Sequence, residues 1–268
     1  MDFRRLRATH IARLLAPVAF LTIGLCAVGA PIQSPIDIRS DRTVFSSLPA
    51  LVFSYSSSTS LELVNTGSPD PEQNVKINVP SGAGSLTLDG TLWPLLQFHF
   101  HERSEHTVNG LPFDMEFHMV HQLATGEYLV VGRFLEVGSF NPLLDSIFSN
   151  LPPAAGDTFD IMSFDLNGLL PSTLNSYRYT GSLTTPPFTE GVNWIVLADP
   201  IELSAGQIDQ FRDLFPDGNV REIQALNDRL ITTDVVGFGT VPEPGTGTIG
   251  GIGLFLLIVR PMIKRHFS

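Results

Sequence analysis

The chain has 268 residues, of which 43% are hydrophobic and 16% are charged, and this composition excludes a disordered tail or a collagen-like repeat. Its formal net charge of −11 argues against a nucleic-acid-binding protein, because such proteins need a basic surface. Cys26 is the single cysteine, so a disulfide framework and a cysteine-rich zinc site are excluded.

Residues 1–30 are typical of a signal peptide. Four arginines lie before or at the start of an apolar run over residues 14–28, and small residues follow at Gly29 and Ala30. A transmembrane helix is the alternative, but the run is shorter than the roughly 20 residues that a span needs. We therefore predict that the chain is exported.

The next 200 residues contain more strand patterns than helix patterns. Partial alternation of apolar and polar residues predicts strands at 61–64, 75–79 and 85–88, and further strands are predicted at 95–100, 113–120, 127–135, 159–163 and 194–197. Two helices are predicted at 142–149 and 204–214, and the second has Ser204 as N-cap with Gln207 as its capping-box partner. The predicted fold is mainly β (α+β): a central twisted, mostly antiparallel sheet with a few short peripheral helices.

Five of the seven histidines lie within 23 residues, at His99, His101, His106, His118 and His121. Residues two apart on a strand share a face, so His99 and His101 point one way while Phe98 and Phe100 point to the apolar side. Glu116 and His118 share a face in the same manner, and antiparallel pairing through the turn at Asn109 and Gly110 brings His118 beside the first two histidines.

Three neutral imidazoles that leave a fourth position open are typical of a catalytic zinc site. His106 and His121 do not fit the same face, and we interpret both as structural. The spacing of His99, His101 and Glu105 is also similar to the first motif of the cupins, but Gly110 follows too closely and the second cupin motif is missing.

The C-terminal residues consist of a segment that interrupts regular structure, an apolar stretch and a basic tail. Val241-Pro242-Glu243-Pro244-Gly245 interrupts regular structure, residues 249–259 are apolar, and Lys264 and Arg265 follow. This order resembles the PEP-CTERM sorting signal of exported bacterial proteins, which an exosortase in the membrane recognises. A plain C-terminal membrane anchor is the alternative.

The segment between the two ends is strongly acidic. Residues 30–240 contain nine basic and 25 acidic residues, a net charge of −16, and Lys76 is their only lysine. Such a surface repels anions at long range.

The central segment resembles the α-class carbonic anhydrases. Four ordered motifs between residues 33 and 230 carry the resemblance: Gln33–Ile38, Gln97–His121, Tyr179–Leu197, and a closing set of Asn219, Arg221, Gln224, Leu226, Asn227 and Arg229. The resemblance implies the fold of that family and a carbonate dehydratase, a lyase that hydrates CO₂ reversibly to bicarbonate and a proton.

The resemblance also implies a role for each site residue. His99, His101 and His118 would hold Zn²⁺, whose bound hydroxide attacks CO₂. Thr184 would accept a hydrogen bond from that hydroxide and donate its own proton to Glu105. The metal ligands would be supported by Gln97, Glu116 and Asn219. The substrate would contact Val120, Val130, Leu183, Thr185, Val192 and Trp194.

Two departures from the family pattern affect expectations. Many relatives have a proton-shuttling histidine where this chain has Ser68, and the following residues, which include Glu72, read as an insertion. Secreted relatives often have a disulfide cysteine where this chain has Phe188. We therefore expect proton export through buffer, water or a carboxylate, and no disulfide.

The predicted organisation has three parts: a signal peptide at 1–30, the carbonic-anhydrase-like domain at 31–236, and a linker with the sorting or anchor segment at 237–268. The predicted location is periplasmic or at the cell surface, with at least transient membrane attachment through the C-terminus. The rival function is a catalytically weak or idle carbonic-anhydrase-related binding module at the cell surface. The sequence leaves the oligomeric state open.

Overall fold

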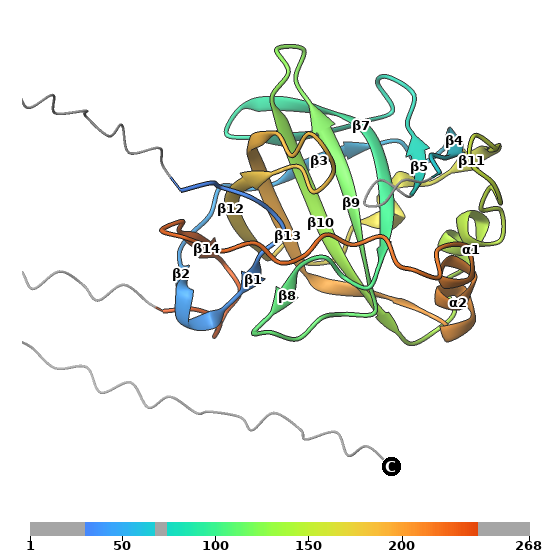
Figure 1. Ribbon diagram of the computed structural model, residues 1–268. Coiled ribbons are helices and arrows are strands. Elements are labelled where there is room, and N and C mark those ends of the chain that lie inside the picture. The colour runs from blue at the N-terminus through green and yellow to red at the C-terminus, as the bar shows by residue number, and fades with distance from the viewer. Residues whose placement is uncertain (1–29, 68–73, 241–268) are drawn as a thin grey trace, which may run out of the picture. The chain divides into compact units, whose positions relative to one another are not determined.

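The computed structural model describes residues 30–67 and 74–240, and one large mixed sheet dominates them (Figure 1). Within these residues the sheet has twelve strands, most of them paired antiparallel. In spatial order the main path contains β11 (Thr158–Phe164), β4 (Thr59–Asn65), β5 (Val75–Asn78), β7 (Thr91–Glu102), β9 (Met115–Gln122), β10 (Tyr128–Val137), β13 (Glu190–Leu203), β12 (Ser176–Ser182), β14 (Ile231–Thr233) and β2 (Thr43–Phe45).

Short elements complete the fold. β6 (Gly84–Leu88) pairs with β7 and with β3 (Val52–Tyr55), and β1 (Asp37–Ile38) pairs in parallel with β8 (Thr107–Val108). Two 3₁₀ turns lie at Ser40–Arg42 and Leu166–Leu169. The mainly β architecture predicted from the sequence is confirmed.

The register of β7 against β9 places the histidines. His99 lies opposite His118 and His101 lies opposite Glu116, whereas Phe98 pairs with Met119 on the other face. Directly opposite residues of an antiparallel pair point to the same side of the sheet. One face of this strand pair is therefore polar and the other is apolar, as the alternation in the sequence predicted.

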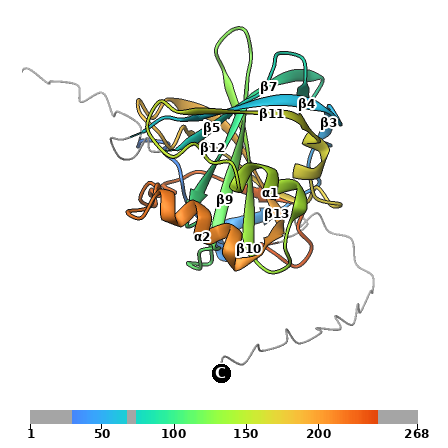
Figure 2. The same ribbon diagram turned by 90° about the vertical axis from the view of Figure 1, so that its right-hand side faces the viewer.

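The apolar face is covered by the two helices, α1 (Pro142–Phe148) and α2 (Ala205–Leu214) (Figure 2). Phe148 of α1 and Phe211 of α2 pack against Phe100 of β7, with ring centroids 5.1 and 6.4 Å from it. The predicted capping box at Ser204 and Gln207 is present at the start of α2. The helices exclude water from the apolar face, and all of β9 except its last residue is buried.

Six strands were not predicted from the sequence: β1, β2, β3, β8, β12 and β14. β1, β2, β8 and β14 have only two or three residues, too few for an alternation pattern to emerge. The pairs β10–β13 and β14–β2 are parallel, and such pairings join segments that are distant along the chain.

No helix within residues 30–67 and 74–240 is long and apolar enough to cross a membrane. The predicted signal peptide and the predicted sorting segment fall almost entirely outside the described residues.

His121 lies on the apolar side of β9 and is completely buried. Its Nε2 is 2.8 Å from the Tyr55 hydroxyl and its Nδ1 is 3.1 Å from the Met119 carbonyl oxygen. Burial lowers the pKa of His121 from its ordinary 6.5 to about 4. Between pH 6.5 and pH 4 the unfolded chain therefore binds a proton that the folded chain does not, and stability falls as the pH falls.

We expect the variant His121→Gln to have a flatter stability profile than the wild type. Between pH 7.5 and pH 5.0 the wild type should lose about 2 kcal/mol of unfolding free energy more than the variant, because only the wild type has this titrating ring. Urea unfolding at both pH values measures the difference. Equal losses in the two proteins would show that His121 does not carry this pH dependence.

Candidate metal centre

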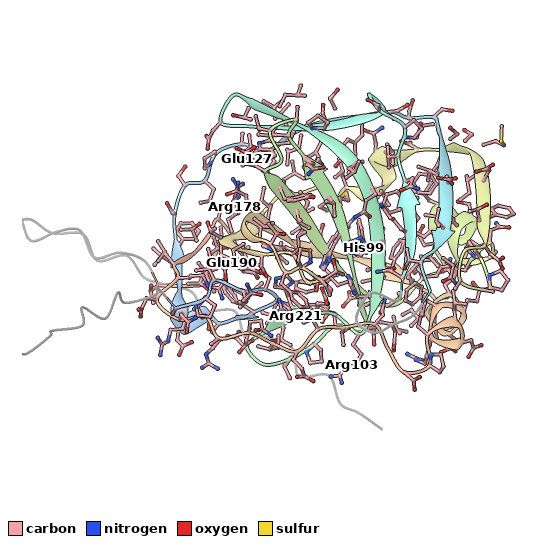
Figure 3. All side chains as sticks on the ribbon, turned by 45° about the horizontal axis from the view of Figure 1, so that its top comes forward. His99, Arg103, Glu127, Arg178, Glu190 and Arg221 are labelled. Atoms are coloured by element: carbon pink, nitrogen blue, oxygen red, sulfur yellow. The ribbon has the colours of Figure 1, made fainter. Side chains whose placement is uncertain are left out.

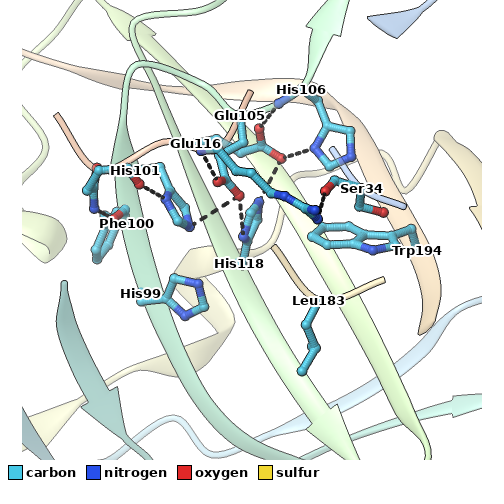
Figure 4. A network of polar contacts seen from close by, with 12 residues as sticks. Ser34, His99, Phe100, His101, Glu105, His106, Glu116, His118, Leu183 and Trp194 are labelled. Carbon is cyan, nitrogen blue, oxygen red and sulfur yellow. Dashed lines mark hydrogen bonds and ion pairs between the residues drawn. The ribbon is translucent and has the colours of Figure 1, made fainter. Parts of the chain in front are cut away.

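Three imidazole rings meet on the polar face of β7 and β9 (Figure 4). The ring centroid of His99 lies 5.0 Å from that of His101 and 5.4 Å from that of His118, and the remaining pair is 4.6 Å apart. His101 and His118 are buried, whereas His99 is partly exposed. Figure 3 shows the position of His99 within the sheet.

One nitrogen of each ring is held by a hydrogen bond that points away from the other two rings. The Nδ1 of His99 is 2.9 Å from Gln97 Oε1, and the Nδ1 of His101 is 2.8 Å from the backbone oxygen of Asn219. The Nε2 of His118 is 3.0 Å from Glu116 Oε1. All three partners are acceptors, so these nitrogens are protonated and the opposite nitrogens have free lone pairs.

The free nitrogens match what a metal ion requires. The three histidines offer ligand atoms that all lie within 4.8 Å of one another. His101 Nε2 is buried and has no hydrogen-bond partner within the described residues. A buried polar atom without a partner is costly, and a cation at this point would satisfy it. Three imidazole nitrogens are a donor set that suits zinc.

Burial keeps His99 and His101 neutral. The pKa of His99 lies well below its ordinary value because the ring is desolvated and because charge on His101 or His118 would repel its own. Burial also lowers the pKa of His101. Since only neutral imidazole binds a metal, both rings are ready to bind at neutral pH.

Glu116 is the acceptor at the centre of a buried hydrogen-bonded chain. Its carboxylate also receives the backbone N–H and the Nδ1–H of His106, both at 2.8 Å. The other ring nitrogen of His106 accepts from the Tyr179 hydroxyl at 2.7 Å, and that hydroxyl lies 2.8 Å from the hydroxyl of Ser34. These contacts agree with the interpretation of His106 as a structural residue. Its ring shares the Glu116 carboxylate with His118.

Opposing effects act on the pKa of Glu116. Burial alone would raise it, but the rings of His106 and His118 hold it well below its ordinary value. The carboxylate is thus charged and fixed between two imidazoles. Gly132 lies opposite His118 on β10, where an added Cβ would come within 2.8 Å of Glu116 Oε1. Gly132 has no signature in the sequence, because its role depends on a neighbouring strand.

Glu105 points its carboxylate at the same centre. Oε1 accepts the backbone N–H of Arg221 at 2.8 Å, while Oε2 is buried, lacks a hydrogen bond, and lies 3.6 Å from His101 Nε2 and 3.7 Å from His118 Nδ1. The hydrogen bond expected from Thr184 to Glu105 does not occur among the described contacts. Thr184 is buried and lines the cavity in front of the histidines.

That cavity has a volume of about 180 Å³, and its wall combines apolar side chains with polar ones. Five of the six residues expected at the substrate line it: Val120, Val130, Leu183, Thr185 and Trp194. Val192, the sixth, does not line the cavity but is buried in the same apolar cluster as Trp194. Lys76, Leu96 and Tyr128 also line the cavity and were not predicted. Ser68 and Glu72 lie outside the described residues.

Comparison with known proteins gives a consistent result. Residues 23–235 match the family described as eukaryotic-type carbonic anhydrase. A carbonic anhydrase of Nostoc sp. is 40% identical over 211 residues, covering 77% of both chains, and one of Neisseria gonorrhoeae is 38% identical, covering 77% of this chain and 79% of its own. The solved structure of an α-carbonic anhydrase from Thermovibrio ammonificans, in complex with the inhibitor sulfanilamide, superposes with a TM-score of 0.70 at 38% identity, covering 75% of this chain and 86% of its own.

We expect Glu116→Gln to weaken zinc binding about 10- to 100-fold, because the variant lacks the charged acceptor that orients His118. Competition with a chromogenic chelator measures the affinity. Glu127→Gln is the matched control, since Glu127 is an exposed carboxylate on the β9–β10 turn (Figure 3). Equal affinity of both variants would contradict the role assigned to Glu116.

Proposed function

The chain belongs to the eukaryotic-type carbonic anhydrases, which hydrate carbon dioxide reversibly to bicarbonate, and we propose that its reaction uses a zinc ion held by His99, His101 and His118. One observation carries the assignment. Each of these rings has one nitrogen held by a fixed acceptor, and the three remaining nitrogens converge.

A zinc ion bound there would act as a Lewis acid and lower the pKa of water to about 7. The chain's own residues supply orientation and exclude bulk water. Glu116 holds the Nε2–H of His118 and thereby fixes the tautomer whose Nδ1 is free. Gln97 and Asn219 do the same for His99 and His101.

We assign the orientation of the attacking oxygen to Thr184, with Glu105 as the acceptor of its proton. Two observations support this assignment. Thr184 lines the cavity that also contains His99 and His118, and Glu105 Oε2 is a buried acceptor without a hydrogen bond in the described residues. A hydroxyl that donates to a fixed carboxylate has its lone pairs directed toward the substrate side.

The apolar wall suits an uncharged substrate. Carbon dioxide needs no charged partner to enter a pocket formed by Val120, Val130, Leu183 and Trp194. Trp194 also touches the metal site, with its ring centroid 4.8 Å from that of His118. The acidic surface therefore does not hinder hydration, because the substrate has no charge.

The rival function is a catalytically idle binding module at the cell surface. An idle relative is expected to lose at least one metal ligand, whereas all three histidines are present here with their hydrogen-bond partners. The enzyme is therefore the function that the site supports best.

We further propose that the chain is exported and that its C-terminus is a sorting segment processed by an exosortase at the membrane. The support is the order of features in the sequence. The N-terminus is basic and then apolar, and the C-terminus has a proline-containing segment, an apolar stretch and a basic tail.

We expect His118→Ala to lose both zinc and catalysis, because two imidazoles leave the metal weakly held. Elemental analysis measures the zinc content, and stopped-flow CO₂ hydration measures the rate, which should fall to the uncatalysed value. His121→Gln, on the opposite face of the same strand, should keep zinc and activity. Wild-type activity in His118→Ala would refute the ligand assignment.

The export proposal predicts two cleavages. Expressed in a bacterium with an exosortase, the mature protein should lack about 30 residues at the N-terminus and the basic tail at the C-terminus, as intact mass would show. Replacing Pro242, Glu243 and Pro244 by alanine should preserve the tail. A full-length protein retained in the cytoplasm would overturn the proposal.

A further inference from the structure

A second hollow lies against the cavity of the metal centre. It has a volume of about 260 Å³ and is lined by Thr66, Asn74, Lys76, Gln97, His99 and Thr185. Four of these residues, Lys76, Gln97, His99 and Thr185, also line the inner cavity. We call this second space the outer hollow. The two spaces are therefore adjacent, and the shared side chains lie at the boundary between them.

Strand register directs Lys76 to this boundary. On β5 it lies opposite His99 of β7, so the two side chains share the polar face of the sheet. Its neighbour Ile77 lies opposite Phe98 and is completely buried in the apolar core. Lys76 is partly buried and forms no ion pair with the other described residues. A partly desolvated ammonium without a carboxylate partner attracts anions more strongly than a fully solvated one.

Two further donors lie at the boundary. Gln97 uses its Oε1 to accept from His99, which leaves its Nε2 amide as a donor. The Thr185 hydroxyl forms no hydrogen bond within the described part of the chain, and it too lines both spaces.

Asn74 also belongs to the wall of the outer hollow. Its side-chain Oδ1 is buried, and no group within the described residues donates a hydrogen bond to it. Asn74 is 8% exposed and lines the outer hollow. Because this oxygen is closed to solvent, it is not a contact for a ligand in the outer hollow.

We propose that the outer hollow is a subsite for bicarbonate, in which Lys76 binds the anion as it leaves or approaches the metal centre. This inference rests on the proposed function, since it concerns the product of that reaction. Bicarbonate has one negative charge and oxygens that can accept hydrogen bonds from Lys76, Gln97 and Thr185. Carbon dioxide has no such charge.

The proposed subsite offsets the repulsion between bicarbonate and the acidic chain. The region of residues 30–240 has a net charge of −16, which repels an anionic product or an anionic substrate of the reverse reaction at long range. Lys76, the only lysine in that region, lies at the boundary of the metal cavity and offsets the repulsion locally. Lys76 is thus a specificity-determining residue for bicarbonate and not for carbon dioxide.

The test compares Lys76→Gln and Lys76→Arg with the wild type at fixed ionic strength. The first measurement is the inhibition of CO₂ hydration by added bicarbonate. Lys76→Gln should raise the inhibition constant roughly fivefold, the range expected for one partly exposed charged contact. Lys76→Arg keeps the charge and should restore most of the affinity.

Arg42→Gln is the matched control, because it removes one exposed positive charge away from both cavities. An inhibition constant that is unchanged in Lys76→Gln, or that rises equally in Arg42→Gln, would overturn the subsite. The latter result would mean that net charge alone controls the affinity.

A second measurement does not depend on catalysis. Titration of ¹³C-labelled bicarbonate with zinc-free protein should broaden its NMR line for the wild type and for Lys76→Arg, but much less for Lys76→Gln. Equal broadening by wild type and Lys76→Gln, or none by the wild type, would reject the subsite. If the wild type instead binds no zinc and hydrates no CO₂, the proposed function fails, and this titration still decides the role of Lys76.

Discussion

The metal centre depends on one constraint: each of three imidazoles has one nitrogen held by a fixed acceptor, so that the other must face its neighbours. Gln97, the backbone oxygen of Asn219 and Glu116 provide the acceptors. None of them can donate through the atom it uses, so the tautomer of each ring is determined. Without these partners the rings could rotate or change tautomer, and a metal ion would meet a poorly prepared site.

Glu116 is a completely buried carboxylate in this arrangement. A buried carboxylate is expensive unless it is paired and hydrogen-bonded, and Glu116 meets this requirement with two imidazoles and a backbone amide. The chain of contacts continues through His106 and Tyr179 to Ser34, which lies near the start of the described domain. Residues far apart in the sequence therefore hold one metal ligand in position.

The apolar half of the site and the charged half have separate tasks. Val120, Val130, Leu183 and Trp194 provide a wall that suits a small uncharged molecule, and the histidines provide the place for chemistry. Lys76, at the boundary with the outer hollow, is suited to the anionic partner of the same reaction. A chain with so acidic a surface can in this way handle a neutral substrate and an anionic product at neighbouring places.

The sequence by itself determined the alternation of β7 and β9, and with it the shared face of His99 and His101 and that of Glu116 and His118, because strand periodicity places side chains two residues apart on one side. It also determined both helices and the capping box at Ser204, since these are local patterns. Only the tertiary structure decided the parallel pairing of β10 with β13, the space that Gly132 leaves for Glu116, the buried location of His121 beside Tyr55, and the position of Lys76 opposite His99. The physical reason is that strand register and packing join residues distant along the chain, and no local pattern records which distant residue will become the neighbour.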